Sequence, residues 1–205
     1  MKPKSIQKTL NPHVLPKAKI KWENKYDNNI NWEKIWGNLK KKTYLKNYIS
    51  EFQWKSIHNI IYTECRLNRM GLSQVQGCCH FCKHHLETQH LFSNCKIIFP
   101  VIQYIQTLFF KEDNVKFDQQ SIILGYDKGT EKGVILGNIL IYVAKWTIRK
   151  QRNKIKYQNI LCKTATLIRI FKTELKEHLI LRQKHNHNTS PNIDKEINYI
   201  ILKLN

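Results

Sequence analysis

Four cysteines and four histidines fall within one eighteen-residue stretch of the sequence, from Cys78 to Cys95. The best set of metal ligands in it has the spacing C-x2-C-x7-H-x4-C and consists of Cys79, Cys82, His90 and Cys95. Two cysteines three residues apart form a knuckle whose thiolates converge on one ion, and the later histidine and cysteine can complete a tetrahedron. Three thiolates and one imidazole suit Zn²⁺. The spacing therefore predicts one structural zinc ion with no open coordination position.

Other residues of the stretch fit a metal site less well. Cys78 could replace the first cysteine of the knuckle, but a C-x3-C spacing is less common. His80 lies between the two knuckle cysteines, too close to both. His84 and His85 follow the knuckle so closely that the loop could hardly fold back. We expect His84 and His85 to face solvent or polar neighbours.

We expect the metal to be needed for folding, because few large apolar residues lie between positions 71 and 96. A bound zinc ion would supply the folding free energy that so small a core lacks. Leu91 and Phe92 follow the histidine ligand directly. We expect these two side chains to pin the knuckle to the flanking helices.

The segments around the cluster have apolar residues at the three-and-four spacing of helices, without sustained β alternation. The predicted fold is therefore mostly α, a helical domain with an inserted small CCHC zinc knuckle. The predicted helices cover about residues 32–39, 43–60, 62–70, 100–110, 130–156, 157–184 and 192–204. The predicted regions are a flexible basic N-terminal segment (1–28), helices plus the knuckle (29–117, with the knuckle at 79–95) and a basic helical C-terminal region (118–205).

The net charge of +20 gives the surface a strong positive field. Such a field favours polyanions, nucleic acid first and anionic membrane second. No apolar run approaches the length of a membrane span, and no secretory signal follows the N-terminus. Six cysteines without such a signal indicate a reducing compartment and metal binding. We therefore expect an intracellular protein, nuclear or cytoplasmic, with nucleic acid and no membrane as its partner.

Basic side chains recur at helical spacing in the two long predicted helices. Four in the first helix are four, three and four residues apart, which places them on one face, and three in the second repeat the arrangement. Such rows can follow a phosphate backbone. Three more lie near the cluster, where three thiolates and one Zn²⁺ would sum to −1. The predicted nucleic-acid contacts are Arg66, Arg69, Lys83, Lys145, Arg149, Arg152, Lys156, Arg169, Lys172 and Lys176.

The tryptophans divide into two groups. Those on apolar helix faces are predicted to be core residues, and they are Trp32, Trp36, Trp54 and Trp146. Trp22 lies between lysines in a polar segment. Aromatic rings in basic surroundings can stack on nucleic-acid bases, so Trp22 is a candidate for that role.

The runs NWEKIW, FQWKSIHNIIYTECRLNRMGL and CCHFCKHHLETQHLFSNC resemble one family. They are similar to the zinc-binding region that follows the polymerase in reverse transcriptases of LINE-type (non-long-terminal-repeat) retrotransposons. The resemblance covers about residues 31–110. The positions that match the family pattern are Phe52, His58, Gly71, Cys79, Cys82, Glu87, Thr88, His90, Leu91, Phe92 and Cys95.

The parts that carry catalysis in such elements have no counterpart in the sequence. The polymerase needs an aspartate pair for Mg²⁺, and no adjacent Asp-Asp pair or endonuclease signature occurs. The resemblance implies a non-catalytic, zinc-stabilised module that contacts RNA or DNA backbone beside the polymerase part of a retrotransposon polyprotein. The alternatives are a zinc-knuckle protein–protein interaction module and a small metal-dependent nuclease.

Overall fold

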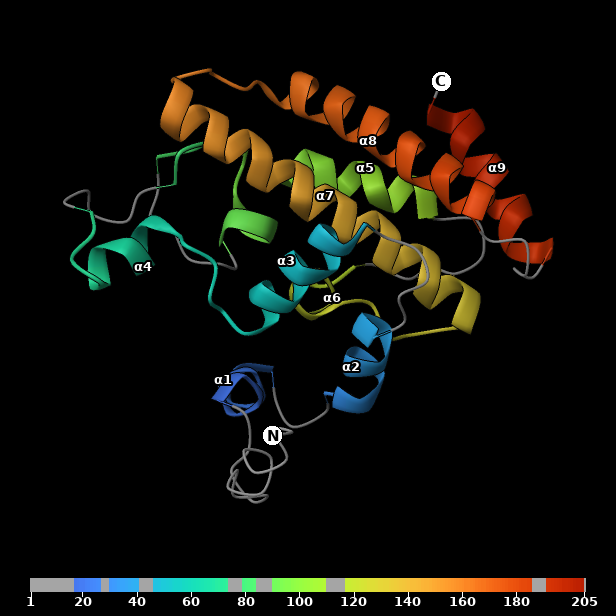
Figure 1. The fold of residues 1–205 in the computed structure, drawn as a ribbon, viewed down its shortest axis with the longest axis horizontal. Helices are drawn as coiled ribbons and strands as arrows, with labels where there is room; N and C mark the ends of the chain where they lie inside the picture. The colour runs from blue at the N-terminus through green and yellow to red at the C-terminus, as the bar shows by residue number, and fades with distance from the viewer. Residues whose placement is uncertain are drawn as a thin grey trace, which may run out of the picture.

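The fold is known from a computed structural model, which describes residues 17–26, 30–40, 46–73, 79–83, 90–109, 117–185 and 191–204. These residues form no strand, so the prediction of a mostly α protein is confirmed (Figure 1). The elements are α1 (Lys17–Tyr26), α2 (Trp32–Lys40), α3 (Asn47–Ile57), α4 (Glu64–Arg69), the π-helical turn η2 (His90–Asn94), α5 (Phe99–Phe109), α6 (Gln119–Leu124), α7 (Glu131–Gln158), α8 (Thr164–His185) and α9 (Pro191–Leu204).

Helix α7 is the central element of the fold. All six residues from Ile139 to Ala144 are buried, so the middle of the helix is covered on every side. A helix that is apolar all round belongs in a core rather than on a surface. Helices α3, α5 and α8 pack against α7, and α9 packs against α8 (Figure 1).

Side-chain caps explain where several helices begin. The Thr130 hydroxyl accepts the backbone N–H of Gly133 at 3.1 Å and starts α7. The Asp118 carboxylate caps α6 in the same way, accepting the backbone N–H of Ser121 at 2.7 Å. Each cap satisfies an N–H group that has no partner within the helix. Asn159, in the left-handed region at φ 52°, ends α7.

The two long predicted helices are present, but their junction differs from the prediction. Helix α7 continues to Gln158, and α8 starts only at Thr164. Leu161, which was predicted to lie on the apolar face of the second helix, is in the connection and is 87% exposed. Helical spacing alone could not locate this break, because Leu161 keeps the rhythm of the residues that follow it.

One apolar core extends through the whole described chain, from Ala18 in α1 to Leu204 in α9. The two predicted regions on either side of residue 117 therefore share a core. No helix in the described residues is both long enough and apolar enough to cross a bilayer.

Residues 1–28 were predicted to be a flexible segment. That prediction is wrong for residues 17–26, which form α1. Ala18, Trp22 and Tyr26 are each four residues apart, so they make one apolar stripe on the helix. Trp22 is fully buried, and its Nε1–H donates to the carbonyl of Ile57 at 2.6 Å. The flanking Lys21 places its ammonium 4.8 Å from the Trp22 ring centroid. Trp22 is thus a core residue and not a base-stacking one.

The predicted core tryptophans have mixed outcomes. Trp32 is buried, and Trp36 and Trp146 are half-buried against the core. Trp54 is 43% exposed, so its assignment to the core is wrong. Its ring lies on His58, with 4.2 Å between the ring centroids, so it packs on a neighbouring turn instead.

Candidate metal centre

The four predicted ligands lie together. The donor atoms of Cys79, Cys82, His90 and Cys95 are all within 4.8 Å of one another. The sulfurs of Cys79 and Cys95 are 4.0 Å apart, and the Cys82 sulfur is 3.0 Å from His90 Nε2. This cluster could bind a metal ion. The alternative ligand Cys78 and the histidines His84 and His85 fall outside the described residues.

Two short backbone structures position the ligands. The first pair lies on a tight turn, where the N–H of Lys83 donates to the carbonyl of Cys79 at 2.8 Å and Lys83 has φ 64°. The second pair is held by η2. A π-helical turn closes hydrogen bonds between residues five apart, which keeps His90 close to Cys95. The carbonyl of Cys95 then accepts the N–H of Phe99, which begins α5, at 2.8 Å.

The cluster is covered by protein. Cys79 and Cys95 are fully buried, Cys82 is almost so, and His90 is half-buried. Leu91 and Phe92, within η2, are also buried. The Phe92 ring meets the Phe52 ring of α3 edge-on at 6.0 Å, which fixes the second ligand pair to the helical core. The predicted packing role of Leu91 and Phe92 is therefore confirmed.

The electrostatics of the cluster favour a bound cation. The hydrogen bond with Cys95 lowers the pKa of Cys79 to about 4; burial opposes this, and the backbone N–H groups of Phe81 and Cys82 add to it. The same contact raises the pKa of Cys95. A thiolate at Cys79 and a thiolate at Cys95 would repel each other at 4.0 Å. A cation among the sulfurs would remove that repulsion, so the donor set fits a metal ion.

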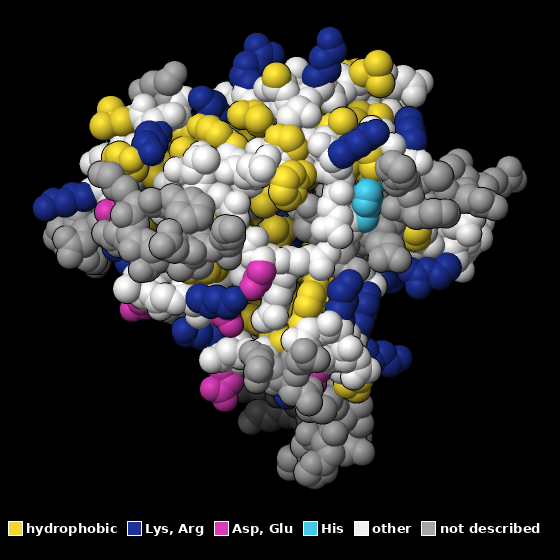
Figure 2. All heavy atoms as spheres, turned by 180° about the vertical axis from the view of Figure 1, so that it is seen from behind, with side chains coloured by type: hydrophobic (Ala, Val, Ile, Leu, Met, Phe, Trp, Pro, Cys, Tyr) yellow, Lys and Arg dark blue, Asp and Glu magenta, His cyan; other side chains and the backbone are white. Residues whose placement is uncertain are grey.

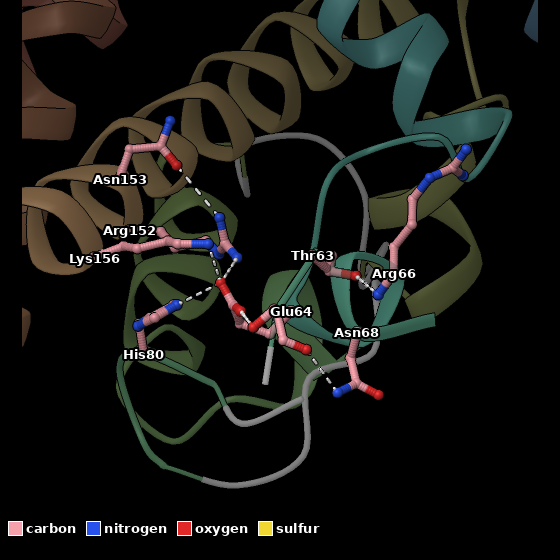
Figure 3. A network of polar contacts seen from close by, with 9 residues as sticks. Thr63, Glu64, Arg66, Asn68, His80, Arg152, Asn153 and Lys156 are labelled. Atoms are coloured by element: carbon pink, nitrogen blue, oxygen red, sulfur yellow. Dashed lines mark hydrogen bonds and ion pairs between the residues drawn. The ribbon is translucent and has the colours of Figure 1, made fainter. Parts of the chain in front are cut away.

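A buried carboxylate lies beside the knuckle, and the sequence gives only a weak sign of it. Glu64 is 2% exposed at the start of α4 (Figure 3). Its Oε1 accepts hydrogen bonds from Nε2 of His80 at 3.1 Å, from Arg152 at 3.4 Å and from the ammonium of Lys156. Its Oε2 accepts from the hydroxyl of Ser73 at 2.9 Å.

The partners of Glu64 decide its charge state. Burial alone would raise the pKa of Glu64, but hydrogen bonds from Lys156, His80 and Ser73 outweigh burial and hold the pKa at about 2. The carboxylate is therefore ionised at neutral pH. The sequence signal for it is the position of an acidic residue directly after the Thr63 cap, where acidic side chains favour helix starts. That signal did not indicate burial.

The predicted basic row of α7 does share one face, but the face points inward. Lys145 is fully buried and its Nζ donates to Gln53 Oε1 at 2.6 Å, Ser56 Oγ at 2.8 Å and the Ile123 carbonyl at 3.0 Å. Burial lowers the pKa of Lys145 well below its usual value. The prediction that Lys145 contacts a phosphate backbone is wrong, because its ammonium is enclosed by α3, α6 and α7.

The rest of the row also faces protein. Arg152 is 4% exposed and bound to Glu64, so its prediction as a backbone contact is wrong as well. Lys156 is half-buried against the same carboxylate. Arg149 is half-buried, with its guanidinium 4.8 Å from the Phe52 ring centroid and 5.3 Å from that of Trp146.

The other predicted contacts are more accessible. Arg69, Lys83 and Arg169 are exposed, and Arg66, Lys172 and Lys176 are half-buried. Figure 2 shows Lys and Arg side chains spread over one face of the molecule, interspersed with apolar side chains and few acidic ones. On this face the positive charge is therefore spread out rather than collected in one row.

No family model matches the sequence, and no curated protein or solved structure is significantly similar to it.

Proposed function

We propose that the chain is a non-catalytic nucleic-acid-binding module stabilised by one structural zinc ion. The observation that carries this proposal is the convergence of three cysteines and one histidine in a buried cluster. Tetrahedral zinc with Zn–S bonds of about 2.3 Å holds its sulfurs about 3.8 Å apart. The 4.0 Å between the sulfurs of Cys79 and Cys95 is close to that spacing.

The nature of the donors supports a structural ion rather than a catalytic one. Catalytic zinc has three protein ligands and keeps a fourth position for water, whereas four protein ligands close the shell. A nuclease would need that open position. The zinc would join the turn of Cys79 and Cys82 to η2, and through Phe92 to α3, in a region with few other large apolar contacts.

The charge supports nucleic acid as the partner. The net charge is +20, and several cations, Arg69, Lys83 and Arg169 among them, reach the solvent. The resemblance to the region after the polymerase of LINE-type reverse transcriptases points to the same ligand. In that context the module would hold RNA or DNA beside the polymerase part of a polyprotein.

Binding driven by phosphate contacts responds steeply to salt. Each phosphate neutralised contributes about −0.9 to the slope of log K against log salt for duplex DNA and about −0.7 for single strands. Fluorescence anisotropy with labelled RNA and DNA at several salt concentrations measures this slope. We expect affinity to fall by orders of magnitude between low and moderate salt, and a flat response would contradict nucleic-acid binding.

A protein-interaction module is the second candidate, and one observation favours it. Tyr157, Ile160 and Leu161, at the junction of α7 and α8, are 71%, 51% and 87% exposed. Neighbouring exposed apolar side chains mark interaction sites more often than isolated ones do. A flat salt response together with one bound zinc would favour this candidate.

A further inference from the structure

A basic cavity lies beside the knuckle, between α3, α4, η2 and α7. Its volume is about 390 Å³, within the range of small-molecule sites. None of the described residues that line it is acidic, and four are cationic. The lining residues that matter for its chemistry are Lys55, Tyr62, Arg66, Arg149, Arg152 and Tyr157.

Two arginine Nε donors behind the cavity wall have no acceptor among the described residues. Arg152 is 4% exposed, and its buried Nε has no hydrogen-bond partner. The buried Nε of Arg66 also has none, although its Nη1 donates to the Asn59 carbonyl at 2.7 Å. Both Nε atoms are enclosed by protein, so they add positive charge to the wall without offering a hydrogen bond to a ligand in the cavity.

The carboxylates near the arginines are shared with lysines: Glu51, which acts electrostatically on Arg149, also pairs with Lys55. Glu64 faces Arg152, but the same carboxylate also binds Lys156. The guanidinium of Arg66 is directed away from Glu64 (Figure 3). Among the described residues, the guanidinium of Arg149 has no hydrogen-bond partner and lies against the Phe52 and Trp146 rings. An anion with several oxygens would complete this wall, and phosphate matches the geometry of arginine.

Two exposed tyrosines line the same cavity. Tyr62 is 59% exposed and Tyr157 is 71% exposed, so the cavity is open to solvent at both rings. The Arg66 guanidinium lies 5.9 Å from the Tyr62 ring centroid, and the Lys156 ammonium lies 5.2 Å from that of Tyr157. Accessible aromatic rings next to cations are the surfaces on which unpaired bases stack.

We propose that this cavity binds one nucleotide of single-stranded nucleic acid, with its phosphate at Arg149 and its base on Tyr62 or Tyr157. A duplex cannot present a base in this way, because its bases are stacked and paired. The inference rests on the proposed nucleic-acid-binding function and specifies the site and strand state.

The test compares labelled single-stranded oligothymidylate, its abasic analogue and a duplex of the same length, on the full zinc-loaded chain. Of the variants Tyr62→Ala and Tyr157→Ala, the one that removes the stacking ring should weaken oligothymidylate binding. The double variant should weaken this binding roughly 5- to 100-fold. The double variant should leave the abasic analogue unaffected. Arg149→Gln should weaken both single-stranded probes. The tyrosines are exposed, so melting curves should show intact folding.

The matched control is Arg169→Gln, an exposed cation on α8 that does not line the cavity. It should reduce binding of all three probes by the same small factor. Competition by free thymidine monophosphate shows whether the cavity takes a free nucleotide or one within a strand. A site for free nucleotides would be saturated by it at low concentration, and a site for a nucleotide within a strand would not.

The two failures are distinguishable. The cavity proposal would be overturned if binding stays salt-sensitive but the tyrosine double variant does not alter it. It would also be overturned if that variant weakens binding of oligothymidylate and of its abasic analogue equally. Both outcomes would leave the proposed function intact. The absence of binding to every probe at low salt would overturn both.

Discussion

The guanidinium of Arg152 lies 3.4 Å from the carboxylate of Glu64, across 88 residues of sequence. This pair joins α7 to the start of α4, next to the metal cluster. Lys145 and Lys156, on the same face of α7, also bind residues of α3 and α4. The basic face of α7 thus binds α3 and α4, the two helices that precede the knuckle.

Replacement of Glu64 should strongly destabilise the fold. Glu64→Gln would leave Arg152 and Lys156 without their carboxylate, and removal of one partner of a buried ion pair costs about 3–5 kcal/mol. The free energy of unfolding in urea measures the loss. Glu51→Gln is the matched control, because Glu51 forms an exposed pair with Lys55. Equal stability of the two variants would contradict the structural role of Glu64.

Acid should weaken the fold through the same carboxylate. The pKa of Glu64 is about 2 in the folded protein, against an ordinary value of 4.5. Its contribution to stability is therefore complete above pH 4.5 and disappears as the pH falls toward 2, a difference of about 3 kcal/mol. Urea unfolding of the wild type and of Glu64→Gln, compared at each pH, isolates this effect from protonation of the metal ligands. The difference between the two proteins should shrink over this range, and a constant difference would refute the assignment.

Lys145 should matter for stability and not for nucleic-acid binding. Lys145→Met would remove the donor shared by Gln53, Ser56 and Ile123, at a cost of about 1–3 kcal/mol. Thermal melting measures that loss. The salt slope of nucleic-acid binding should be unchanged, because the ammonium is fully buried. A smaller slope in Lys145→Met, with folding intact, would show that this lysine does reach phosphate.

Loss of one metal ligand should be far more damaging than loss of another cysteine. Cys95→Ser removes a ligand from the cluster, so we expect it to lose metal and much of its thermal stability. Cys162→Ser is the control, because Cys162 is half-buried and lies outside the cluster. Metal content per chain and melting temperature compare the two variants. Similar metal content in both would remove Cys95 from the ligand set.

Much of the fold was predictable from local signals. The apolar spacing of α7 and α8 identifies both helices, although the junction between them, where Asn159 ends α7, was not located. The convergence of Cys79, Cys82, His90 and Cys95 was predictable because each element of the CCHC spacing is short, so the geometry is decided locally.

The sequence did not predict which side of a helix faces the core and which side faces solvent. Spacing shows that Lys145 and Arg152 share a side of α7, but the direction of that side depends on Glu64 and Gln53, about 90 residues away. The burial of Trp22 was hidden by its lysine neighbours; the Lys21 ammonium extends over the Trp22 ring, and that of Lys25 extends over the Tyr26 ring.

The central claim is that one zinc ion holds the knuckle to the helical core. The most direct measurement is the metal content of the purified full chain, with far-ultraviolet circular dichroism and melting curves before and after chelation. We predict one zinc per chain, and a clear loss of helical signal or of melting temperature once it is removed. A chain that contains no zinc and keeps its helical signal and melting temperature in the presence of chelator would contradict the claim.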